Sequence, residues 1–141
     1  MVNAVQGEQL LTAVSCVGSV DRNRGRRLVA FFACQMYAAM WPAEAVGLMK
    51  QNCYLPEKGW GTLTLKETRP LSGTRWTDSG QRHDKGGLKS RDPKADRPVA
   101  IPPMLVDMLR AYLEEFGTAK DGRFFANERG AVLGTSSYWR V

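Results

Sequence analysis

The sequence has few residues of the kinds that bind metal ions or form disulfide bonds. Its three cysteines, Cys16, Cys34 and Cys53, are odd in number and include no C-x-x-C pair, which argues against a disulfide framework and a zinc site. The single histidine, His83, has no cysteine or acid at ligand spacing, so we interpret it as a loop residue and not as a metal ligand or general base. We therefore expect no cofactor.

Long hydrophobic runs and phosphate-binding glycine motifs are also absent. The longest mostly apolar run, Leu28 to Trp41, is interrupted by Gln35 and is shorter than the roughly 20 residues that cross a bilayer. No signal-peptide pattern is present, and the glycine pairs Gly59-Trp-Gly and Gly86-Gly87 lack the spacing of nucleotide-binding loops. These absences predict a cytoplasmic protein with no membrane partner.

What the sequence does contain is enough apolar material for one domain and an excess of positive charge. The 141 residues are 43% hydrophobic, and 20 Lys and Arg against 14 Asp and Glu give a net charge of +6. A basic protein of this size favours polyanions as partners, DNA among them.

The positive charge is concentrated in two segments. Between residues 65 and 97 there are nine basic residues against five acidic ones, and a second cluster occupies an expected loop at 21–27. A cationic loop suits a phosphate backbone, and the alternative is a solvated loop that binds nothing. The expected DNA-binding residues are Arg82, Lys85, Arg91, Lys94, Arg22, Arg24, Arg26 and Arg27.

Hydrophobic periodicity predicts an α+β domain that is mostly helical. We expect helices over 8–17, 28–40, 43–49 and 104–116 and short strands over 53–55, 61–66 and 98–101. The strands should form a small antiparallel sheet between the 43–49 and 104–116 helices. The whole chain, 1–141, is then a single domain with a long loop or hairpin insertion at about 68–96, and its last residues begin another helix.

Trp41 stands immediately before Pro42, at the break between two of these helices. Proline disfavours helical geometry in the preceding residue and suits the first turn of a new helix. The indole could be a core plug, a surface anchor or a replacement for a residue that once did chemistry. Because its neighbours on both sides are apolar, we expect it to pack at the helix junction.

Four segments resemble the catalytic domain of the tyrosine recombinases, the phage-integrase family. They are "RRLVAFFACQMYAAMWPAEAVGLMKQNC", "WTDSGQRHDKGGLKSR", "RPVAIPPMLVDMLRAYLEEFG" and "DGRFFANERGAVLGTSSYWRV". The resemblance implies a partial catalytic domain of a family that cuts and rejoins DNA through a tyrosine nucleophile, without metal or nucleotide cofactor. Two arginines, a histidine and a lysine surround the phosphate in that family, because arginine forks meet its developing negative charge.

Carried over by this resemblance, Lys89 matches the family's hairpin lysine and Glu44 matches the acid that supports the first catalytic arginine. Trp41 stands where that arginine is expected. An indole has one N–H donor and no charge, so it cannot grip a phosphate bidentately, and we expect a rate loss of at least about 10². The family's His-x-x-Arg motif and nucleophile should follow residue 141, so Tyr138 is not taken as the nucleophile.

These observations predict a protein associated with DNA recombination and DNA integration that is truncated, inactive alone and able to bind DNA weakly and nonspecifically. In a bacterium it would lie near the nucleoid. Two alternatives stay open: an interaction module that pairs with a full-length recombinase, and a marginally stable gene remnant. In the latter case, uncovered apolar faces at Phe31, Phe32 and the 104–116 helix should cause self-association or poor solubility.

Overall fold

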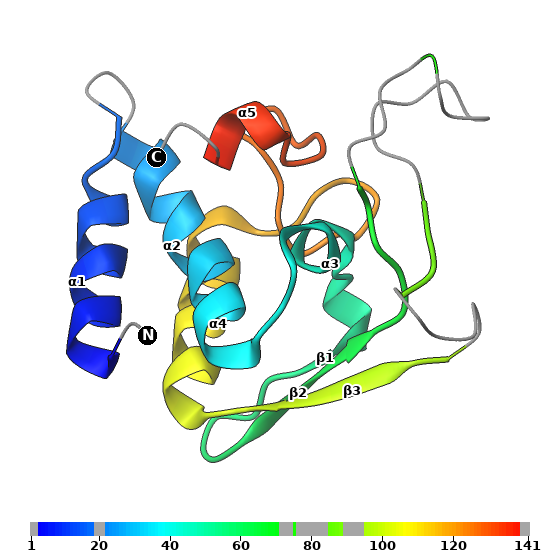
Figure 1. Ribbon diagram of the computed structural model, residues 1–141, viewed down its shortest axis with the longest axis horizontal. Coiled ribbons are helices and arrows are strands. Elements are labelled where there is room, and N and C mark those ends of the chain that lie inside the picture. Colours follow the sequence, from blue (N-terminus) through cyan, green and yellow to red (C-terminus); the bar gives the residue numbers. More distant parts are fainter. Residues whose placement is uncertain (1–2, 19–21, 71–74, 76–84, 89–94, 139–141) are drawn as a thin grey trace.

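The structure, a computed structural model, describes residues 3–18, 22–70, 75, 85–88 and 95–138. It is an α+β fold, mostly helical, with one three-stranded antiparallel sheet. In Figure 1 the sheet lies along one edge of the molecule and the helices α2, α3 and α4 lie beside it, with α1 on the far side of α2. No helix in these ranges is long and apolar enough to cross a membrane.

The first two helices, α1 (Ala4–Ser15) and α2 (Arg22–Ala38), pack against each other. A reciprocal capping box starts α1, because the Asn3 side chain accepts the Gln6 backbone N–H and the Gln6 side chain accepts that of Asn3. Gly25 sits at the crossing, where an added Cβ would lie 2.3 Å from the Val14 carbonyl oxygen. Only glycine allows the two helices this close.

The prediction of a loop over residues 21–27 was wrong, because α2 begins at Arg22. The polar, arginine-rich composition hid the helix start from a reading based on apolar periodicity. Arginine is a good helix former, and Gly25 is retained inside the helix by the close contact with α1. Arg24, Arg26 and Arg27 therefore belong to a helix and not to a loop.

The break between α2 and α3 (Pro42–Gly47) falls where the sequence predicts it. Ala39 has a positive φ of 48°, and Trp41 is extended, with Pro42 opening the next helix. This turn buries Met40 and leaves Trp41 66% exposed. The prediction that the indole packs at the junction was wrong, because the turn directs the preceding side chain inward instead.

A short 3-10 helix, η1 (Lys50–Asn52), leads into the sheet, formed by β1 (Cys53–Tyr54), β2 (Gly61–Leu65) and β3 (Arg97–Ile101) in that order. Tyr54 pairs with Thr62, and Leu63 pairs with Val99. Alternate residues of β2 are buried, so one face of the sheet packs on the core.

The chain returns through α4 (Pro103–Phe116), which Gly117 closes, and ends in the short α5 (Thr135–Tyr138). An aromatic cluster joins these elements to α2: the Phe31 ring lies 5.6 Å from Phe125 and 5.0 Å from Tyr138, between ring centroids. Phe31 is fully buried, so the expectation that it would be uncovered was wrong. The returning segment and α5 supply the cover, and Phe32 is partly buried in the same core.

Candidate nucleic-acid interface

Glu44 is the best-anchored polar residue near the exposed Trp41. Its side chain is only 6% exposed, and one carboxylate oxygen accepts the Trp41 backbone N–H at 2.8 Å. The other oxygen accepts the Arg97 guanidinium at 3.0 Å. Glu44 thus caps the first turn of α3 and links this helix to the start of β3. The indole ring of Trp41 takes no part in these contacts and is exposed to solvent.

A second ionic group lies where the chain leaves β2 and passes along α3. Glu67 accepts from the Arg69 guanidinium at 3.1 Å and from the Lys85 ammonium at 2.9 Å, and the Arg69 backbone N–H donates to the Ala43 carbonyl at 2.9 Å. Gly47 of α3 permits this approach, since an added Cβ would lie 2.7 Å from the Glu67 carbonyl oxygen.

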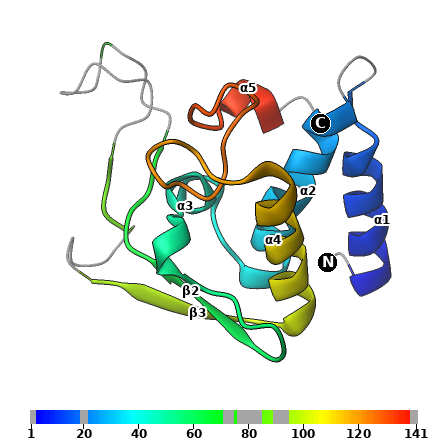
Figure 2. The same cartoon turned by 180° about the vertical axis from the view of Figure 1, so that it is seen from behind.

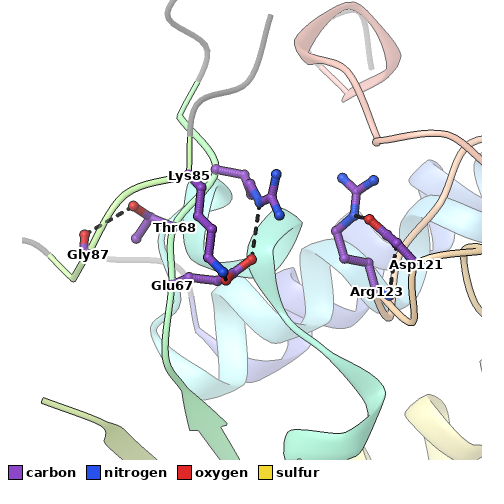
Figure 3. Close-up of polar contacts among 7 residues, drawn as sticks. Glu67, Thr68, Lys85, Gly87, Asp121 and Arg123 are labelled. Atoms are coloured by element: carbon purple, nitrogen blue, oxygen red, sulfur yellow. Dashed lines mark hydrogen bonds and ion pairs between the residues drawn. The ribbon is translucent and has the colours of Figure 1, made fainter. Parts of the chain in front are cut away.

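Lys85 belongs to the returning arm of the insertion. Thr68 and Gly86 exchange backbone hydrogen bonds of 2.8 and 2.9 Å, and the Thr68 hydroxyl donates to the Gly87 carbonyl at 3.2 Å (Figure 3). Leu88, the next residue, is buried. The two arms therefore meet in an antiparallel bridge, as a hairpin insertion predicts, and Lys89 follows directly after the buried leucine in sequence.

Asp121 and Arg123 form a third group, beside the residues that follow α3, where Met49 and Arg123 form a β-bridge. The Arg123 guanidinium donates through Nε to Asp121 at 2.6 Å, and Figure 3 shows the pair to one side of the Glu67 and Lys85 side chains. Burial opposes ionisation of Asp121, but the Arg123 backbone N–H and guanidinium, together with the charge of Arg69, outweigh it and hold the pKa of Asp121 below its usual value. Arg123 itself is buried.

The α2 arginines fall into two kinds. Arg26 forms an ion pair with Glu115 of α4. Arg24 and Arg27 instead line a pocket of about 420 Å³ between the first turns of α2, the 126–133 loop and α5. In Figures 1 and 2, α5 and the loop before it lie beside this end of α2. The pocket was missed at the sequence level because Arg129, which also lines it, is about 100 residues from α2.

Several expected site residues lie outside the described residues. These are Lys89, Arg82, Arg91 and Lys94, and the side chain of Arg22. In the described ranges, no group of three or more His, Cys, Asp or Glu residues could hold a metal ion.

Two comparisons of the sequence gave no match: no protein-family model fits the chain, and no curated protein is significantly similar to it. The fold, in contrast, is similar to solved recombinases. A structure of the XerH site-specific recombinase bound to palindromic difH substrate aligns with a TM-score of 0.62 at 16% identity, over 95% of this chain and 31% of that chain. A pre-cleavage complex of XerH with difH gives 0.63 at 16% identity, over 95% and 32%.

The Tn1549 transposon integrase in complex with transposon right-end DNA aligns with a TM-score of 0.69 at 12% identity, over 97% of this chain and 40% of that chain. The chain thus spans between about a third and two fifths of the length of these structures. Identities this low show the fold alone. With the sheet, the helix break and the bridged hairpin in the expected order, this chain has a tyrosine recombinase/integrase-like fold.

Proposed function

We propose that this chain is a DNA-binding protein of the tyrosine-recombinase type, associated with DNA recombination and integration in a bacterial cytoplasm. The observation that carries the proposal is the fold similarity over 95–97% of the chain to proteins whose structures were solved with DNA. The net charge of +6 supports it, because phosphate neutralisation supplies most of nonspecific DNA affinity.

The proposed DNA contacts come from the insertion and from α2. They are Arg82, Lys85, Arg91 and Lys94, and Arg22, Arg24, Arg26 and Arg27. Among those on α2, Arg26 should contribute least, because its ion pair with Glu115 already neutralises its charge. Arg24 and Arg27 should contribute most.

We further propose that the chain does not cleave DNA by itself. By resemblance, Lys89 is the hairpin lysine and Glu44 the supporting acid, but Trp41 occupies the first arginine position. The indole is exposed and uncharged, and the nearest buried acid, Glu44, already accepts the guanidinium of Arg97. By the same resemblance, the family's His-x-x-Arg motif and tyrosine nucleophile have no counterpart within residues 1–141.

Fluorescence anisotropy with a labelled DNA duplex tests the binding proposal. The dissociation constant should rise with salt, with a log–log slope of about 0.9 for each phosphate neutralised. Binding that does not weaken as salt rises, or no binding at low salt, would contradict it. On the same DNA, neither the wild-type chain nor Trp41→Arg should yield a covalent protein–DNA product, and such a product would refute the proposed inactivity.

A second candidate function is pairing with a full-length recombinase or with another copy of this chain. It is favoured by exposed apolar side chains on α1, where Val5 and Leu10 are 63% and 56% exposed. Light scattering over a concentration series distinguishes a monomer from a self-associating protein, and a concentration-independent monomer mass would leave only the recombinase as partner.

A further inference from the structure

We propose that the pocket between α2, the 126–133 loop and α5 is a phosphate-binding site. It is lined by three arginines, Arg24 and Arg27 from α2 and Arg129 from the distant 126–133 loop, with the serines Ser136 and Ser137 beside them. Its volume of about 420 Å³ accommodates a phosphate group together with part of the molecule that carries it.

The first argument is charge. None of the three pocket arginines forms an ion pair with a carboxylate among the described residues. Elsewhere, Arg26, Arg69, Arg97 and Arg123 are each paired with an acid. Glu128 is the one acid that lines the pocket, so three positive charges face one negative charge. A doubly charged anion compensates this excess better than a carboxylate does.

The second argument is that the arginines are held in place before any ligand binds. Arg24 and Arg27 are three residues apart on α2 and therefore lie on one face. The Arg24 guanidinium donates to the Ser137 carbonyl at 3.3 Å, and the Arg27 guanidinium lies 4.5 Å above the centre of the Phe116 ring. The Nε of Arg27 is buried and has no hydrogen-bond partner in the described chain, which leaves a charged donor unsatisfied.

The backbone of the loop that carries Arg129 is shaped by its own hydrogen bonds. The Asn127 side-chain oxygen accepts the backbone N–H groups of Arg129 and Ala131 at 2.9 and 3.0 Å. An Ala126–Val132 bridge closes the loop at its base. Planar guanidinium forks match the tetrahedral oxygens of phosphate, each fork donating two N–H groups, and those of Arg24 and Arg27 are already held by contacts within the chain.

The phosphate could be carried by a small phosphate ester or by a DNA backbone, and only the second source rests on the proposed function. Arginine side-chain NMR of the ¹⁵N-labelled chain, titrated first with inorganic phosphate, tests the site directly. The Nε resonances of Arg24 and Arg27 should shift in a saturable manner. Arg24→Gln, Arg27→Gln and Arg129→Gln should each weaken phosphate affinity by about tenfold, as expected for losing one charge-assisted hydrogen bond.

Arg26→Gln is the matched control. It removes the same charge from the same helix, one residue from Arg27, but Arg26 lies outside the pocket, so phosphate affinity should change less than about twofold. Arg24 and Arg129 are not in the core, so their variants keep the test valid if Arg27→Gln unfolds the chain, which a thermal melt would reveal. No saturable shift, or an equal loss in Arg26→Gln, overturns the proposal.

A competition experiment then distinguishes the two sources. If a DNA duplex displaces phosphate from the pocket, the site holds a backbone phosphate. If both bind together, the site takes a separate phosphate ester and DNA binds elsewhere. If the duplex does not bind at all but phosphate still shifts Arg24 and Arg27, the proposed function fails while the phosphate site stands.

Discussion

The side of the molecule around α3 and the pocket beside α5 are both rich in basic residues, but they use them differently. Around α3, Arg69 and Lys85 share Glu67, Arg97 pairs with Glu44, and Arg123 pairs with Asp121. In the pocket, Arg24, Arg27 and Arg129 line a cavity that contains one acid. The Glu44–Arg97 and Glu67–Lys85 pairs connect segments that are distant in sequence and thus stabilise the fold, whereas the pocket has a surplus of positive charge that is available to a ligand.

A count of basic residues therefore does not locate an anion site. The insertion contains more basic residues than the α2 segment, yet two of its described cations, Arg69 and Lys85, already share the acid Glu67. A guanidinium that already donates to a carboxylate has fewer donors left for a phosphate, and the nearby negative charge opposes binding.

The largest expected effect comes from breaking the ion pair of Glu44, which has the most buried carboxylate on the α3 side. Glu44→Gln should lower the free energy of unfolding by about 3 kcal/mol, because it leaves the Arg97 charge partly buried without its counter-ion. Urea denaturation measures the change. Arg26→Gln, which breaks the exposed pair with Glu115, is the comparison and should cost less than about 1 kcal/mol. Equal losses would mean that Glu44 does not organise this region.

A smaller effect, on DNA affinity, should follow from removing an acid on the α3 side, so that its basic residues face less negative charge, as those of the pocket do. Glu67→Gln removes the negative charge that Arg69 and Lys85 share, so DNA affinity at low salt should rise about threefold. Anisotropy titrations measure it. Glu57→Gln, an equal charge change at an exposed position in the turn between β1 and β2, should raise affinity less, and an equal rise would show that only net charge matters.

The smallest expected effect is on the pH dependence of thermal stability. The pKa of Asp121 in the folded chain lies below its ordinary value of 3.8, so its ionised form contributes stability that is complete above that value and is lost as pH falls through the folded pKa. Wild type should therefore melt above Asp121→Asn by a few degrees at most at neutral pH, since Asp121 is half exposed. The difference should shrink below about pH 4, and a difference that grows there would contradict the pairing with Arg123.

Much of the fold could be predicted from the sequence, because its signals are local. The stripe of apolar residues in α4, the Trp41-Pro42 break and the alternation in β2 each lie within one segment, and the structure confirms them. The start of α2 was missed, because its first turns carry arginines and a glycine whose role depends on contact with α1.

The candidate site was less predictable, because it depends on which charges meet. The sequence placed Arg24 and Arg27 in a basic cluster but could not show that Arg129 joins them or that Arg26 turns to Glu115. The sequence also did not indicate that Arg123 is buried in an ion pair. Its partner Asp121 is only two residues away, but its burial arises where the chain after α4 packs beside the residues that follow α3. Such pairings follow from tertiary packing and not from spacing along the chain.

Because the Trp41 side chain points to solvent, its fluorescence can report what happens at the start of α3. An indole in water emits at longer wavelength than one in a core, and a ring at 66% exposure is open to quenching by whatever approaches it, including a nucleic-acid base that stacks on it. A chain that keeps Trp41 as its single tryptophan would report, through its own emission, whether DNA reaches the start of α3.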